Sequence, residues 1–91
     1  MRISILFGVG LAKTKERILS KICDDSGKGK QMVVAIANRS KDYEMLRDAD
    51  ISIVFGDLKK VKPMLYEVCD YAICDESKLI ELLNRIRRGD G

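Results

Sequence analysis

Two polar stretches carry the side chains best suited to binding chemistry, and each directly follows an apolar run. Gly8–Thr14 follows the run Ile3–Phe7. Asn38–Asp42 follows the run Met32–Ala37. Glycine amides and a lysine suit a phosphate group, whereas the second stretch offers an amide, a guanidinium, a hydroxyl and a carboxylate. Ligands of open parallel sheets bind at the carboxyl ends of the strands, so these stretches form the first candidate site.

The glycine stretch departs from both familiar phosphate-binding patterns. In the P-loop pattern, Phe7 and Ala12 occupy the positions of the two glycines. In the dinucleotide pattern, Lys13 occupies the position of the third glycine, which allows close packing of helix and strand. An ordinary strand-to-helix turn therefore explains Gly8 and Gly10 better than a phosphate cradle does.

Two further polar stretches stand after predicted strands, at Gly56–Asp57 and at Cys74–Glu76. The first is followed by a basic cluster of Lys59, Lys60 and Lys62. We interpret this cluster as a solvated loop rather than as a contact with phosphate or nucleic acid.

The segments Val33–Asp42, Ala49–Gly56 and Cys69–Ile73 follow one another at a specific spacing. Together they resemble the second half of the core of haloacid-dehalogenase-type (HAD) phosphohydrolases. The likeness is greatest to the last conserved motif of P-type ATPases and sugar phosphatases, and Lys13 or Lys15 lies about where that family has a conserved lysine. The resemblance implies a HAD-like, Rossmannoid α/β fold over roughly the last four fifths of the chain.

The chain departs from this family at the residues that carry its chemistry. No aspartate lies in Met1–Phe7, so the DxDx[TV] nucleophile motif is absent. Asn38 replaces the aspartate that helps to hold Mg²⁺, Ala37 replaces a glycine and Lys41 replaces an asparagine. Asp42 stays as the single candidate metal ligand, and no other cofactor is indicated. Aspartyl-phosphate chemistry requires the missing carboxylate, so the resemblance implies a truncated domain without phosphatase activity.

Three functions remain open for such a chain. The first is a non-catalytic binding, regulatory or subunit protein. The second is one half of a split phosphohydrolase, whose partner chain would supply the nucleophile. The third is a small NADP-type nucleotide-binding domain, in which Asn38, Arg39 and Ser40 would suit a ribose 2′-phosphate.

The composition of the 91 residues limits the chemistry further. The chain has no histidine, which excludes histidine-based acid–base catalysis, and its net charge of +3 is only mildly basic. Cys23, Cys69 and Cys74 show no CxxC spacing and are predicted to be reduced, mostly buried thiols. The apolar segment Ile3–Ala12 lacks a cleavage site and is too short to span a membrane, so a cytoplasmic location is expected, without a membrane or nucleic-acid partner.

Strand and helix signals alternate along the chain, which predicts one three-layer, doubly wound α/β domain over residues 1–91 with about four parallel strands. The predicted strands are Ile3–Phe7, Met32–Ala37, Ile51–Phe55 and Tyr71–Cys74. Thr14, Ser40 and Asp75 are predicted helix caps, and Pro63 a helix start. Gly27 and Gly29 are expected to end the first helix. The predicted inward side chains of the helices are Ile18, Leu19, Ile22, Cys23, Tyr43, Leu46, Met64, Leu65, Val68, Leu79, Leu82, Leu83 and Ile86.

The first strand is predicted to pair in parallel with Met32–Ala37, in the place that the nucleophile strand has in HAD enzymes. The two polar stretches would then face each other across one crevice. The candidate ligand site consists of Gly8, Gly10, Lys13, Asn38, Arg39, Ser40 and Asp42. Because a short open sheet leaves unpaired edges, we also expect a homodimer or a partner protein to bind through a sheet edge.

Overall fold

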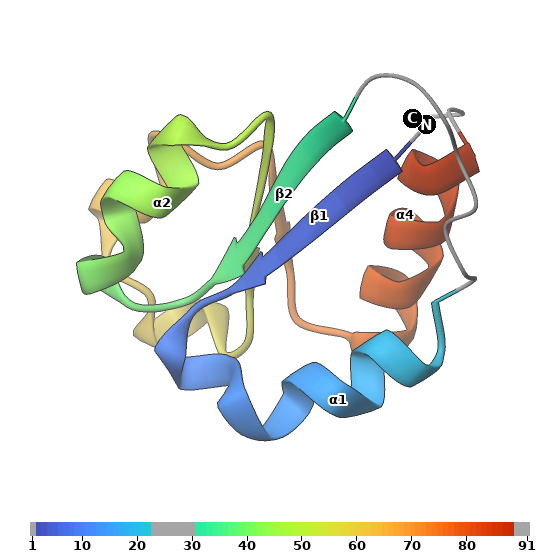
Figure 1. Ribbon diagram of the computed structural model, residues 1–91. Coiled ribbons are helices and arrows are strands. Elements are labelled where there is room, and N and C mark those ends of the chain that lie inside the picture. The colour runs from blue at the N-terminus through green and yellow to red at the C-terminus, as the bar shows by residue number, and fades with distance from the viewer. Residues whose placement is uncertain (1, 23–30, 89–91) are drawn as a thin grey trace.

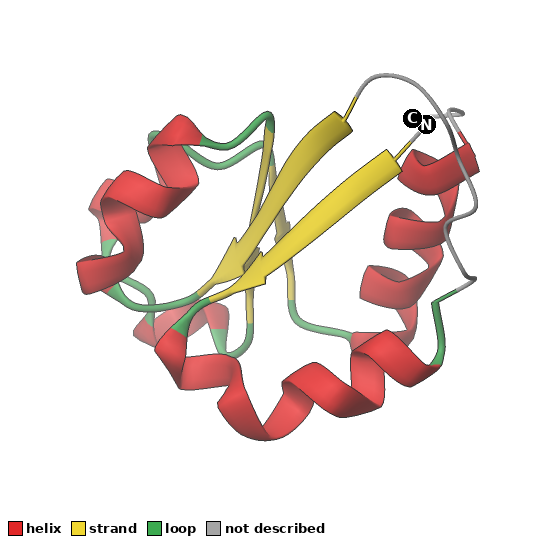
Figure 2. Ribbon diagram, in the orientation of Figure 1, coloured by secondary structure: helices red, strands yellow, loops and turns green. Residues whose placement is uncertain are grey.

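The computed structural model describes residues 2–22 and 31–88, which form one all-parallel sheet with helices on both faces (Figure 2). The strands lie side by side in the order β1-β2-β3-β4. They are β1 (Arg2–Phe7), β2 (Gln31–Ala37), β3 (Ile51–Phe55) and β4 (Tyr71–Ile73). The α-helices are α1 (Ala12–Ser20), α2 (Tyr43–Asp48), α3 (Pro63–Tyr66) and α4 (Glu76–Arg88). Three short 3-10 helices are η1 (Val9–Leu11), η2 (Ser40–Asp42) and η3 (Leu58–Lys60).

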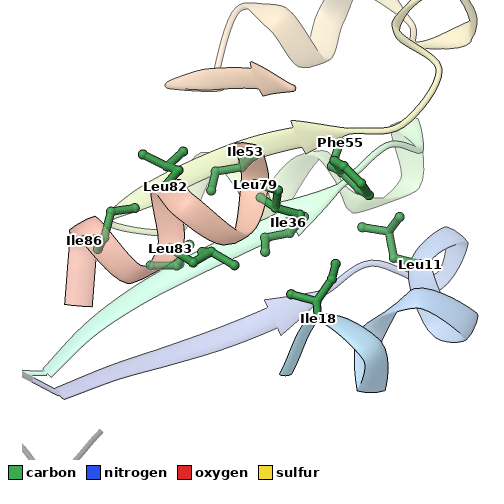
Figure 3. Close-up of a cluster of buried hydrophobic side chains, with 10 residues drawn as sticks. Leu11, Ile18, Ile36, Ile53, Phe55, Leu79, Leu82, Leu83 and Ile86 are labelled. Carbon is green, nitrogen blue, oxygen red and sulfur yellow. The ribbon is translucent and has the colours of Figure 1, made fainter. Parts of the chain in front are cut away.

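Each face of the sheet has its own apolar core. On one face, α1 and α4 pack against β2 and β3 through side chains such as Ile18, Leu83 and Ile53 (Figure 3). On the other face, Leu46 of α2 and Leu65 of α3 pack on the same two strands. Figure 1 shows α2 and α4 on opposite sides of the sheet. The prediction of a three-layer, doubly wound α/β domain is confirmed.

The first strand lies where the pairing prediction placed it. β1 pairs with β2 in parallel, with Ile5 opposite Val34, and the N–H of Gly8 extends the ladder by donating to the carbonyl of Ile36 at 2.7 Å. The residues from Val34 to Ala37 are fully buried, as the continuous apolar run predicts for a strand covered on both faces.

The order of the strands has a consequence for the path of the chain. The strands follow one another in a single direction across the sheet, yet α1 lies on one face and α2 on the other. The β1–α1–β2 and β2–α2–β3 connections therefore have opposite hands, and one of them has the left-handed sense that is rare in parallel sheets. The chain leaves β1 and β2 toward opposite faces, and the loops that follow these two strands begin side by side at the carboxyl edge of the sheet.

Several predicted helix features are wrong at the edges of the fold. Thr14 does not cap α1, because η1 runs directly into the helix, which already starts at Ala12. Ser40 is the first residue of η2 and not its N-cap; Arg39 occupies the N-cap position, without a side-chain hydrogen bond. The predicted inward positions of Leu19 and Met64 are wrong: the two side chains are 42% and 41% exposed, and no helix or strand of the described part of the chain covers them. The predictions for Cys23, Gly27 and Gly29 fall outside the described residues.

Other local predictions are confirmed. Pro63 is the first residue of α3. Asp75 caps α4: its Oδ1 accepts hydrogen bonds from the N–H and the hydroxyl of Ser77 at 2.9 and 2.7 Å. The predicted stripe of α4, namely Leu79, Leu82, Leu83 and Ile86, is buried.

The thiols are less buried than predicted. Cys69 is half-buried, and burial raises the pKa of its thiol. Cys74 is exposed, because it follows the end of the short edge strand β4, so the prediction of mostly buried thiols is wrong for this residue. Within the described residues, no helix combines the length and the apolar character needed to cross a membrane.

Two aspartates fasten the starts of β3 and β4 to the neighbouring strand in the same way. Asp50 precedes β3, and it donates its N–H to the carbonyl of Val33 at 2.9 Å while its Oδ2 accepts the N–H of Val33 at 2.8 Å. Asp70 precedes β4 and makes the same pair of bonds with Ser52, at 2.7 and 2.8 Å. Each aspartate satisfies the backbone of one residue of the neighbouring strand and so helps to set the register.

We expect Asp70→Ala to lower the free energy of unfolding by about 1–2 kcal/mol, because the N–H of Ser52, a residue only 1% exposed, loses its acceptor. Asp70→Asn keeps an oxygen acceptor and should lose less. Urea unfolding of the two variants measures the difference, with Asp48→Ala as a control, since Asp48 is exposed and its carboxylate pairs with the exposed side chain of Arg47. Equal losses for Asp70→Ala and Asp70→Asn would contradict this role.

Candidate functional site

The carboxyl ends of β1 and β2 meet at Gly8 and Asp42. A Cβ atom built on Gly8 would lie 2.5 Å from Oδ2 of Asp42 and 2.8 Å from Cβ of Ala37. Only a glycine leaves room for the carboxylate at this position. The Oδ2 atom is buried, and none of the residues that the structure describes gives it a hydrogen bond.

Asn38 occupies the centre of the site. Its side chain lies between Gly10, which follows β1, and Gly56, which follows β3; a Cβ built on Gly56 would lie 2.8 Å from its Nδ2. Gly56 has a φ of 138°, a conformation that other residues rarely adopt. A Cβ on Gly10 would also lie 2.9 Å from Nε of Arg39. The amide of Asn38 therefore fills the space between the ends of three strands.

Beside Asn38 an open pocket of about 250 Å³ lies between the carboxyl ends of β2 and β3. It is lined by Asn38, Arg39, Asp57, Lys60 and Val61. Arg39 and Lys60 are exposed cations, whereas Val61 is buried and forms an apolar wall. Asp57 caps η3 through its Oδ1, which accepts the N–H of Lys59 at 3.1 Å, so this carboxylate is partly engaged within its own loop. The pocket thus presents an amide and two cations to solvent.

The structure brings together most of the predicted site. Gly8, Gly10, Asn38, Arg39 and Asp42 lie in contact at the ends of β1 and β2. Of these only Asn38 and Arg39 line the pocket. Lys13 and Ser40 are exposed and are not among the pocket residues.

Lys60 and Val61 line the pocket but are not among the predicted site residues. Gly56–Asp57 is a predicted strand end, whereas the prediction for the adjacent lysines is a solvated loop. The structure places Lys60 in the last turn of η3, where the loop brings it back to the pocket. The sequence signal for this return is Asp57, a residue type that favours capping turns.

Two further predictions concern this edge of the sheet: the polar stretch after β4 and a metal ligand. Asp75, after β4, is engaged in capping α4, and the hydrogen bonds from Ser77 lower the pKa of its carboxyl group. Within the described residues, no three cysteine, aspartate or glutamate side chains are grouped to hold a metal ion. Binding of Mg²⁺ by Asp42 stays a prediction.

The fold and the site together define a small α/β domain with a four-stranded parallel sheet and a polar pocket at its carboxyl edge. No protein-family model, curated protein or solved structure matches the chain. The resemblance to the HAD core therefore depends on the residues of the motif alone.

Proposed function

We propose that this protein is a non-catalytic binding module, similar to the second half of a HAD core, whose pocket takes a small phosphorylated ligand. The observation that carries the proposal is the convergence of Arg39, Lys60 and the amide of Asn38 on one open pocket. A guanidinium offers paired N–H donors that match phosphate oxygens, and a lysine adds a mobile positive charge. Val61 supports the apolar part of such a ligand.

Other features of the chain argue against catalysis. The resemblance would require an aspartate nucleophile at the end of a strand beside β2, and β1, which occupies that position, contains none. Asp42 packs against Gly8 and does not line the pocket. The chain has no histidine to serve as a general base. A bound phosphate ester would therefore be held and released unchanged.

We expect Arg39→Ala to weaken the binding of phenyl phosphate by about tenfold, because a charge-assisted, two-point contact is lost. Titration followed by two-dimensional NMR measures the affinity and shows whether the amides around Asn38 and Lys60 respond. Arg47→Ala is the matched control, since Arg47 is an exposed arginine on α2 that pairs with Asp48 at 3.0 Å. Equal weakening in both variants would indicate unspecific attraction and contradict the pocket.

The absence of turnover is tested separately, with phenyl phosphate and Mg²⁺ over several hours. We expect no phosphate release. Release that survives repurification and disappears in Asp42→Asn would show a phosphohydrolase, and the split-enzyme function would then replace the one proposed.

A further inference from the structure

Asp57 places a carboxylate in the pocket that also contains the cations Arg39 and Lys60. Its Oδ1 accepts the N–H of Lys59 at 3.1 Å. Among the residues that the structure describes, none donates a hydrogen bond to its Oδ2, and no lysine or arginine forms an ion pair with either oxygen. A carboxylate can accept about four hydrogen bonds in all, so Asp57 has an acceptor to offer to a ligand.

The five residues of the pocket come from two loops, and all five belong to the described part of the chain. Asn38 and Arg39 follow β2, whereas Asp57, Lys60 and Val61 lie in the loop that follows β3. The first loop offers an amide and a guanidinium to an anion. The second offers a carboxylate to a hydrogen-bond donor, together with a lysine whose flexible stem gives its charge a wide reach. The pocket is therefore suited to a ligand with two different polar ends.

The charges of the pocket indicate what the second polar end is. Arg39 and Lys60 attract the dianion of a phosphomonoester, whereas the charge of Asp57 repels it. A ligand that brings only apolar atoms to Asp57 leaves the carboxylate without a partner and takes away part of its water, which weakens binding. A hydroxyl group satisfies the hydrogen bond but not the charge. An ammonium group satisfies both, because it is a cation with three N–H donors.

The size of the pocket limits the length of the ligand. Its volume of about 250 Å³ lies below the roughly 300–1,000 Å³ of pockets that enclose drug-sized ligands. The phosphate and the ammonium group are therefore joined by a short chain of atoms. Val61, which is buried and lines the pocket, gives the carbon atoms of that chain an apolar contact.

We propose that the pocket binds a short primary amine that carries a phosphomonoester, an inference that rests on the proposed binding of a phosphorylated ligand. Arg39 and the amide of Asn38 hold the phosphate oxygens, and Lys60 adds positive charge. The Oδ2 atom of Asp57 accepts an N–H of the ammonium group. Asp57 thereby makes the pocket select amine-bearing phosphate esters over esters of the same size that lack the amine.

Two esters that differ at one end test this selection. They are O-phosphoethanolamine and propyl phosphate, in which a methyl group replaces the ammonium group. We expect phosphoethanolamine to bind the intact protein about tenfold more tightly, as for one charge-assisted contact. Titration followed by two-dimensional NMR measures both affinities.

Asp57→Asn should reduce this preference to less than about twofold. The variant should bind propyl phosphate at least as tightly as the wild type does, because the repelling charge is gone. The asparagine oxygen can still accept the N–H of Lys59, so the cap of η3 is kept. Asp48→Asn is the matched control and should keep the full preference, since Asp48 is an exposed aspartate of α2 that does not line the pocket.

The possible failures separate this inference from the proposed function. If neither ester binds, or if Arg39→Ala leaves both affinities unchanged, the inference and the proposed function are both overturned. If the two esters bind equally tightly and Arg39→Ala weakens both, the pocket takes phosphate and the inference alone is overturned. Tighter binding of 2-hydroxyethyl phosphate than of phosphoethanolamine would make the ligand a phosphorylated alcohol. Equally tight binding of the diester glycerophosphoethanolamine would make it a lipid headgroup, and either result overturns the free amine monoester.

Discussion

Leu83→Ala should lower the free energy of unfolding by about 2–5 kcal/mol, the range for removing a large side chain from a rigid core. Leu83 is 0% exposed and belongs to the cluster that joins α4 to the sheet (Figure 3). Ile18 of α1 lies in the same cluster, so a cavity at Leu83 weakens the packing of both helices on this face. A domain of this size has a total stability of only about 5–13 kcal/mol, so this loss is a large share of it.

Leu82→Ala is the matched control for this prediction. Leu82 is the neighbouring residue on α4, is 9% exposed and lines an open pocket between β4 and α4. Water can enter the space left by its side chain, so the loss should be smaller. Urea unfolding followed by circular dichroism gives both values. A larger loss at Leu82 would mean that α4 packs through a different face.

The sequence predicts β2, β3 and α4 well because each has a strong and complete pattern. β2 is a continuous apolar run, and α4 repeats its leucines at helical spacing over a long segment. The shorter helices are less determined. Periodicity shows that Leu19 and Met64 share an apolar side of a helix, but not whether another element covers that side. Coverage depends on tertiary packing, which a local pattern does not contain.

The path of the chain around β1 is a second limit of sequence reasoning. Adjacent pairing of β1 and β2 and helices on both faces were each predicted. The rare hand of one connection follows from a third feature, the single-direction order β1-β2-β3-β4 with α1 and α2 on opposite faces. Nothing in the residues of α1 indicates the face on which it lies. The burial of Oδ2 of Asp42 is equally a tertiary result, because it depends on the loop after β1 passing directly over η2.

Gly8→Ala tests this meeting of the two loops most directly. The added Cβ would lie 2.5 Å from Oδ2 of Asp42 and 2.8 Å from Cβ of Ala37, so either the loops or the side chain must move. We expect a loss of about 1–3 kcal/mol in the free energy of unfolding, as for other overpacked sites. Asp42→Ala alone should cost less, because it removes a buried oxygen to which none of the described residues donates a hydrogen bond.

The double variant Gly8→Ala/Asp42→Ala isolates the contact between the new Cβ and the carboxyl group of Asp42. Asp42→Ala removes Oδ2 and Cγ, two of the three atoms nearest to the new Cβ, and leaves Cβ of Ala37, so Gly8→Ala/Asp42→Ala should recover part of the loss. A double-mutant cycle by urea unfolding should give a coupling free energy of about 0.5–3 kcal/mol, the range for residues in contact. Additive losses would place Asp42 away from Gly8. The stretch Asn38–Asp42 would then leave β2 along another path, and the pocket that begins at Asn38 would lose its structural basis together with the ligand site proposed there.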